Sequence, residues 1–237
     1  MSLPYFPLHT VLFPHLPLPL DIFEDRYRAM IRDLVAEGSP HGGRFVVSMI
    51  VEGAEVGGPA TTQEVGTICE VRDAQQHADG RWTVLAVGIA RARLGVIDES
   101  GPYALVDAVE LDEPAGAEAP ALVPAVQAAL DAYLATVKRF VARAASVGEH
   151  ANESGATSAS LDEVLKPIHL PDDPVAASYA VGGVLQVELL RKQRLLELPD
   201  AASRLHAELD LLRRETLLLD DGELPTVPAS DLGYHPN

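Results

Sequence analysis

The chain has 237 residues, enough for one large domain or two small ones, and its 47% hydrophobic and 22% charged residues are typical of soluble globular proteins. Its formal net charge of −17 is spread over both halves, and a field of this sign repels the phosphates that nucleic-acid-binding proteins must neutralise. The single cysteine, Cys69, excludes an intrachain disulfide and therefore a secreted disulfide scaffold.

The opening stretch, PYFPLHTVLFPHLPLPLDIFEDRYR from Pro4 to Arg28, is apolar and contains five prolines. It has three possible interpretations: a secretion signal, a proline-rich ligand, or the first piece of a folded core. The missing positive charge before Arg26, the prolines and the lack of a small-residue cleavage site argue against a signal. No window approaches the roughly 18 uninterrupted apolar residues of a membrane helix. We therefore expect a soluble, cytoplasmic protein with no membrane partner.

A helix is predicted from about Glu24 to Glu37, ending at Gly38, because its apolar residues recur at helical spacing. The remainder of the first half is rich in Val, Ile, Thr and aromatic residues between Gly and Pro, which predicts strands. These strands are expected at 44–51, 64–74, 81–97 and 103–111.

Two glycines predict how these strands are arranged. Asp79-Gly80 favours a type I′ turn and a hairpin that pairs residues near 67–77 with 82–89. Gly88, inside the second of these strands, predicts a bulge or a bend that curls the sheet toward closure.

After Pro114 the pattern becomes helical. A continuous apolar stripe predicts a helix through Val126 and Val141, and further helices are expected at 174–190 and 200–219. Asp172-Asp173 before Pro174, and Asp200, are expected to cap the starts of these two helices. The small polar residues at 146–160 predict a loop. The chain is thus expected to divide into a β-rich part (1–113), a helical part (114–222) and a C-terminal tail (223–237).

The sequence contains no recognisable active site. Phosphate-binding loops, the Gly-x-Ser-x-Gly elbow and Cys-x-x-Cys zinc motifs are absent, and the histidines lack metal-ligand spacing. Cys69 lies in an apolar run and is expected to be buried and inert. A Ser–Lys pair from Ser178 or Ser160 with Lys166 has no setting that would activate it. We expect no catalytic residue, no cofactor and no bound metal.

Four segments together resemble the Lon N-terminal (substrate-binding) domain family, in the family's order. FPLHTVLFPHLPLPLDIFEDRYRAMIRD resembles its entry motif, in which two strands joined by a Phe-Pro turn lead into a helix. EVGTICEV resembles its Val-Gly-Thr strand, and DGRWTVLAVGIARARL its hairpin with Gly-x-x-Arg-x-Arg. KQRLLELPDAASRLHAELDLLRRE is similar to the Lys-Gln-x-Leu-Leu-Glu…Asp…Arg-Leu…Glu ending. The resemblance covers about residues 3–215.

The resemblance implies an α+β fold: a PUA-like β pseudobarrel with one inserted helix, followed by an α-helical bundle. It places the prolines of the opening stretch at strand edges and turns, so that the stretch is core and not ligand. Two residues depart from the family pattern. His15 stands where the family usually has Gly after Phe-Pro, and Asp25 where Pro is common before Arg-Tyr.

In Lon proteases this domain helps to capture unfolded or tagged substrates, and an ATPase and a peptidase domain follow it. The resemblance therefore implies a stand-alone, non-catalytic module that binds unfolded or tagged protein segments, with Leu12, Phe13 and Leu16 as candidate peptide-binding residues. The alternative is an adaptor for one dedicated protein partner of a proteolysis pathway. An enzyme with an unrecognised site and an RNA-binding PUA-like module are the remaining classes, and the charge argues against RNA.

Overall fold

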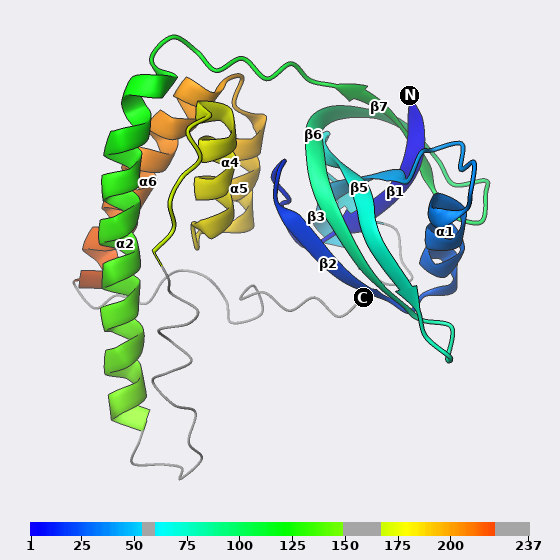
Figure 1. The fold of residues 1–237 in the computed structure, drawn as a ribbon, viewed down its shortest axis with the longest axis horizontal. Helices are drawn as coiled ribbons and strands as arrows, with labels where there is room; N and C mark the ends of the chain where they lie inside the picture. Colours follow the sequence, from blue (N-terminus) through cyan, green and yellow to red (C-terminus); the bar gives the residue numbers. More distant parts are fainter. Residues whose placement is uncertain (54–59, 149–166, 221–237) are drawn as a thin grey trace. The chain divides into compact units, whose positions relative to one another are not determined.

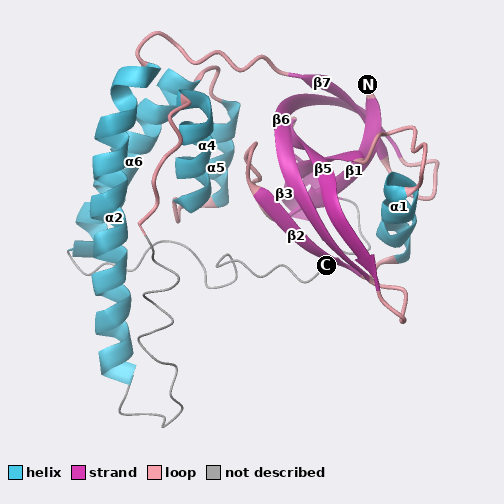
Figure 2. Cartoon of the chain, in the orientation of Figure 1, coloured by secondary structure: helices cyan, strands magenta, loops and turns pink. Residues whose placement is uncertain are grey.

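The computed structural model describes residues 1–53, 60–148 and 167–220. Its described residues form two compact units, the first from Met1–Glu113 and Glu188–Leu198, the second from Pro114–Val187 and from Pro199 to the last described residue, Asp220. Strands dominate the first unit and helices the second (Figure 2). The division differs from the expected one in a single described stretch, since Glu188–Leu198 belongs to the strand-rich unit. The expected tail at 223–237 and most of the 146–160 loop lie outside the described residues.

The first unit is built around a seven-stranded sheet (Figure 1). The strands are β1 (Ser2–Leu8), β2 (Pro17–Ile22), β3 (Arg44–Gly53), β4 (Ala60–Thr62), β5 (Val65–Gln76), β6 (Trp82–Asp98) and β7 (Leu105–Glu110). Their order is β1-β7-β6-β5-β3-β4, β2 pairs with β6, and β1 also pairs in parallel with β3. This last pairing closes five of the strands into a ring, which leaves β2 and β4 with an unpaired side among the described strands.

The predicted hairpin is confirmed, with a different turn. β5 and β6 are antiparallel, and Gln76 opposite Trp82 is their last pair before the turn. A type I′ turn needs a positive φ at both central residues, whereas among the described non-glycine residues His15 alone has one. Gly80, at φ 85°, donates its N–H to His77 O at 2.9 Å. The turn is therefore longer than predicted, and glycine provides its single left-handed residue.

The predicted bend at Gly88 is confirmed. The register between β5 and β6 shifts there, because Ile68 pairs with Ala90 whereas Cys69 pairs with Gly88. A side chain at position 88 would approach Phe13 O to 2.7 Å, so glycine is required for the chain to pass this closely. Beyond this bend β6 exchanges its partner β2 for β7.

Pro17 and Pro19 of the opening stretch lie where a missing N–H removes no ladder bond. Leu16 O accepts a hydrogen bond from Gly88 N at 3.0 Å. Because successive residues of an antiparallel strand direct their backbone groups alternately to opposite sides, Pro17 and Pro19 face the unpaired side of β2. The alternate residues Leu18, Leu20 and Ile22 are buried. The stretch is part of the core, as the sequence predicts.

Helix α1 (Asp25–Val35) covers one part of the sheet with the apolar face that the sequence predicts. Its buried residues are Tyr27, Met30, Ile31 and Leu34, and they share a core cluster with residues of β1, β2, β3 and β6. Phe6 meets Tyr27 edge to face, with ring centroids 4.2 Å apart. The helix ends at Val35, two residues before the predicted end, and Gly38, at φ 76°, lies in the turn that follows, in which Ser39 N donates to Ala36 O at 3.0 Å.

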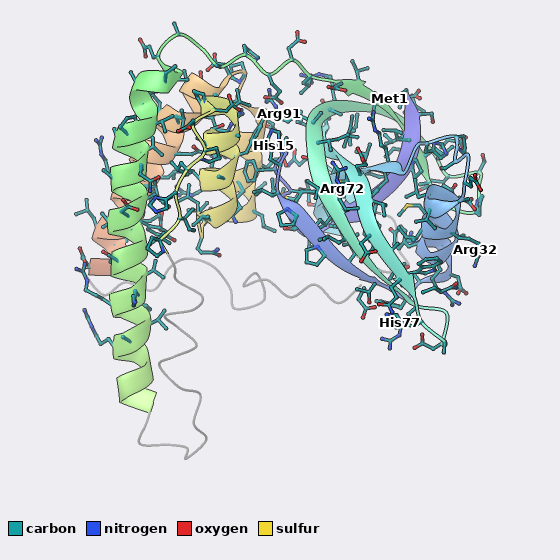
Figure 3. The ribbon with its side chains drawn as sticks, in the orientation of Figure 1. Met1, His15, Arg32, Arg72, His77 and Arg91 are labelled. Carbon is teal, nitrogen blue, oxygen red and sulfur yellow. The ribbon has the colours of Figure 1, made fainter. Side chains whose placement is uncertain are left out.

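Arg91 joins helix α5 (Leu189–Glu197) to the strands of the first unit (Figure 3). Its side chain is 2% exposed and its guanidinium donates to Leu196 O at 2.8 Å and to Leu198 O at 2.6 Å. It also donates to Asp112 O at 3.1 Å and to the Glu113 carboxylate at 2.5 Å. A cation thus satisfies the last carbonyls of α5, where the helix dipole favours positive charge.

The second unit contains α2 (Ala119–Gly148), α4 (Pro174–Val184) and α6 (Ala201–Asp220). The predicted C-terminal end of the helix at 174–190 is wrong. Helix α4 ends at Val184, and the residues from Leu189 form α5, which belongs to the first unit. Both predicted aspartate caps are present. Asp173 accepts from Ala176 N at 3.0 Å and Asp200 from Ser203 N at 2.7 Å.

A buried ionisable pair lies in the core of this unit. Arg204 and Glu208, one turn apart on α6, are both fully buried. Arg204 Nε donates to Ser178 Oγ at 2.8 Å, and its guanidinium lies 4.1 Å from the centroid of the Tyr179 ring. Burial raises the pKa of Glu208 well above its ordinary 4.5, an effect that the charge of Arg204 and the nearby backbone N–H of Gly182 only partly offset.

One described helix, Ala119–Arg143 within α2, is long and apolar enough by length and composition to cross a membrane. Charged residues interrupt this stretch, so the sequence contains no uninterrupted apolar run there that would have predicted a membrane helix. Val126, Leu130 and Tyr133 on this helix are buried, whereas its most apolar window of 18 residues is only 22% buried.

Candidate functional site

The loop between β1 and β2 is fixed by hydrogen bonds to the centre of the sheet. His15 N donates to Gly88 O at 2.8 Å, and Thr67 Oγ1 donates to Leu12 O at 2.5 Å. His15 itself has a φ of 66°, the left-handed conformation that glycine adopts without cost. These contacts hold the entrance of β2, labelled by His15 in Figure 3, in a defined position.

The three candidate peptide-binding residues have different environments. Leu12 is 7% exposed and Phe13 is 0% exposed, so both side chains belong to the core of the first unit. Leu16 is half-buried and packs against the same core cluster. A role of these residues in peptide binding stays a prediction, and Leu16 alone presents part of its side chain to solvent.

Apolar side chains gather beside Leu16 on the outer face of β2 and β6. The ladder joins two outward pairs, Pro17 with Val87 and Pro19 with Leu85. Both prolines are exposed, Leu85 is 41% exposed and Val87 is half-buried. We call these four residues, Pro17, Pro19, Leu85 and Val87, the β2–β6 patch; Leu16 lies beside it and packs against the core. The sequence indicates this patch through an apolar stretch in which every second residue is proline. Only the pairing of β2 with β6 shows that Val87 and Leu85 complete the patch.

The β2–β6 patch can bind a partner through side chains and not through strand pairing. Pro17 and Pro19 have no N–H to offer on the unpaired side of β2, so an added strand would find no donor at these two positions. The adjacent carboxylate of Asp73, opposite Leu85 in the ladder, gives the patch an acidic border. An apolar surface of this kind, bordered by charge, is typical of sites that bind other proteins.

A pocket of about 560 Å³ lies in the first unit, beside β4. Its lining includes Thr61, Thr62, Glu64, Val65, Arg93 and Glu197. Behind it the buried side chain of Gln193 donates from Nε2 to Val65 O at 3.0 Å and to Glu197 Oε1 at 2.7 Å. The segment Lys-Gln-x-Leu-Leu-Glu thus supplies both the glutamine that docks α5 on β5 and a pocket carboxylate, two roles that the sequence pattern did not predict.

Neither Cys69 nor a cluster of acidic residues provides a reactive centre in the described part of the chain. Cys69 is fully buried, and burial strongly raises the pKa of its thiol, which disfavours the reactive thiolate. Within the described residues no group of three or more His, Cys, Asp or Glu side chains is arranged to hold a metal ion. The features that remain for function in this part of the chain are the β2–β6 patch and the β4 pocket.

Comparison with known proteins adds a family match. The model of the "ATP-dependent protease La (LON) substrate-binding domain" matches residues 2–214. Among curated proteins, Lon protease 2 of Syntrophobacter fumaroxidans is 28% identical over 199 residues, covering 83% of this chain and 22% of the relative. Lon protease of Escherichia coli is 24% identical over 225 residues, covering 91% of this chain and 26% of the relative. The chain spans about a quarter of the length of these relatives.

Solved structures show the same fold. The N-terminal domain of Lon protease from the Mycobacterium avium complex has a TM-score of 0.60 and 21% identity, covering 90% of this chain and 98% of that chain. A Lon N-terminal domain protein from Xanthomonas campestris has a TM-score of 0.57 and 20% identity, covering 89% and 98%. The mixed helix and sheet architecture therefore agrees with the one that the sequence predicts.

Proposed function

Because the chain belongs to the LON substrate-binding domain family, we propose that it is a non-catalytic module that binds unfolded or tagged segments of other proteins. The observation that carries the proposal is the β2–β6 patch. It places exposed apolar side chains on a strand pair that is hydrogen-bonded into the sheet, so that binding requires no ordering of the protein itself.

The chemistry of the patch suits segments that folded proteins keep inside. Unfolded chains expose aliphatic and aromatic side chains that native proteins bury, and covering apolar surface contributes roughly 25 cal/mol per Å². Four side chains form a small patch, so we expect dissociation constants on the order of micromolar for a single segment. Such affinity permits the release and recapture of many different segments.

The remaining expectations of the sequence enter the same proposal. We propose that the ring of strands is of the PUA-like kind and that the protein works in the bacterial cytoplasm without catalysing a reaction. A net charge of −17 supports the expectation that RNA and DNA are not partners. The family match concerns the substrate-binding part of Lon proteases, and the chemistry of their other parts is not proposed for this chain.

The proposal is tested by measuring binding of the purified protein to a permanently unfolded polypeptide and to its folded counterpart, at two salt concentrations. We expect preference for the unfolded chain, with little dependence on salt because apolar contacts are not screened. Leu85→Ser should weaken binding severalfold. Ile97→Ser is the matched control, since Ile97 is 40% exposed on the same strand but outside the patch.

Two results would contradict the proposal: equal binding of the folded and unfolded chains, or equal effects of Leu85→Ser and Ile97→Ser. If neither chain binds, a dedicated partner becomes the better hypothesis, and that partner is to be isolated from cell extract. Ser replacements of Leu12, Phe13 and Leu16 test the residues chosen from the sequence. If these variants lower stability but leave binding intact, those residues are structural.

A further inference from the structure

We propose that the β4 pocket receives a basic side chain of an extended segment that adds itself to β4 as a further strand. This inference rests on the proposed function and deepens it. It supplies a second surface and a preference for lysine or arginine, neither of which the β2–β6 patch explains.

The unpaired side of β4 has donors and acceptors for an added strand. Gln63 N donates to Met49 O at 2.9 Å, and Thr62 lies opposite Ile50. In an antiparallel ladder this bond makes Thr62 a residue whose own N–H and C=O point away from β3. No strand in the described ranges pairs with β4 on that side, and Ala60–Thr62 contains no proline. Among the described strands the outer edge of β4 is therefore available for strand addition, whereas Pro17 and Pro19 remove two donors from the edge of β2.

The pocket adjoins β4, so we expect a side chain of a strand added there to reach it. Thr61 and Thr62 of β4 are part of its lining, and alternate residues of an added strand stand on the same face of the sheet. Its volume of about 560 Å³ accommodates a long side chain. Val65 offers apolar contact to an aliphatic stem, and the hydroxyls and carboxylates offer acceptors to the charged end.

The charges of the pocket favour a cation. Glu64 and Glu197 contribute two carboxylates against the single guanidinium of Arg93. The carboxylate of Glu197 is held by Gln193, whose side chain is 2% exposed, so this acceptor is fixed before binding. The chain as a whole carries a net charge of −17, which attracts basic segments and repels acidic ones over longer distances.

The test uses an extended peptide of alternating threonine and valine with one central arginine, and matched peptides with glutamine or glutamate at the centre. We expect the arginine peptide to bind about twofold to fivefold more tightly than the glutamine peptide at low salt, and the glutamate peptide to bind most weakly. Glu64→Gln and Glu197→Gln should each remove much of this preference. Glu110→Gln is the control, an exposed carboxylate on β7 outside the pocket lining.

Arg93→Gln distinguishes a cation site from an anion site. Removing the one positive charge should tighten binding of the arginine peptide, because a repulsive neighbour is lost. Strand pairing is tested on the peptide itself: methylation of alternate backbone nitrogens should abolish binding in one of the two registers and spare it in the other. Neither test depends on a variant that alters the core.

Three results would overturn the inference: equal affinity of the arginine and glutamine peptides, weaker binding after Arg93→Gln, or indifference to backbone methylation in both registers. The unfolded polypeptide is measured in parallel. If it binds through the β2–β6 patch while the peptides fail these tests, the inference fails and the proposed function stands. If nothing binds, both fail.

Discussion

At the scale of single residues, His15 holds a backbone conformation that an L side chain resists. Its φ of 66° costs about 1–2 kcal/mol relative to glycine, whereas glycine loses about 0.5–1 kcal/mol through the greater freedom of its unfolded chain. We expect His15→Gly to raise the free energy of unfolding by about 0.5–1 kcal/mol. Urea denaturation measures the change. His41→Gly, at a loop position without a positive φ, should lower stability, and stabilisation of both variants alike would contradict the explanation.

The thiol of Cys69 provides a second test at this scale. Burial raises the pKa of the thiol, so that almost no thiolate exists at neutral pH in the folded protein. We expect a thiol-specific aromatic disulfide reagent to leave Cys69 unmodified in buffer and to react fully in urea. Rapid modification without denaturant would show that the ring of strands opens around Cys69, against its complete burial.

At the scale of elements, Arg91 attaches the C-terminal end of α5 to the strands of the first unit. One planar guanidinium donates to the carbonyls of Leu196 and Leu198 at the end of the helix, and a lysine ammonium cannot reproduce this geometry. We expect Arg91→Lys to lower the free energy of unfolding by about 3 kcal/mol, because a buried charge network is broken. The amides of α5 should also exchange their hydrogens faster. Arg93→Lys is the control, since the exposed Arg93 should change stability by less than about 0.5 kcal/mol.

Glu208 makes the stability of α6 and its neighbours depend on pH. Its pKa is raised in the folded state, so the folded protein binds the proton more tightly than the unfolded chain. This contribution to stability is complete below the ordinary pKa of 4.5 and declines as the pH rises toward the raised value. We expect Glu208→Gln to remove the decline, as measured by urea denaturation between pH 4.5 and neutrality. Parallel stability curves for the two proteins would mean that Arg204 cancels the effect of burial.

At the scale of the whole molecule, the net charge of −17 opposes compaction. Like charges repel one another across the surface, and the repulsion decays within about 10 Å at 0.1 M salt. We expect the thermal unfolding midpoint to rise between about 20 and 200 mM sodium chloride as screening increases. A midpoint that falls with salt would indicate that the ion pairs, such as Arg81 with Asp79, contribute more than the repulsion.

The sequence by itself determined the features that depend on near neighbours in the chain. The apolar periodicity of α1, the aspartate caps of α4 and α6, the β5–β6 hairpin and the bend at Gly88 each depend on residues within a few positions. The Lon family match, with its fold, was likewise readable from four short motifs. The end of α4 was not, because Leu185–Leu190 is apolar enough to continue a helix.

The tertiary structure alone decided which distant residues meet. It placed α5 on the strands through Arg91 and Gln193, closed the ring by pairing β1 with β3, and made Val87 and Leu85 the neighbours of Pro17 and Pro19. It likewise brought Glu197 beside Thr62 in the β4 pocket. Contacts between residues far apart in sequence depend on register and closure, which a local pattern does not encode. Surfaces for binding are made of such contacts, so the family could be read from the sequence and the candidate surfaces only from the fold.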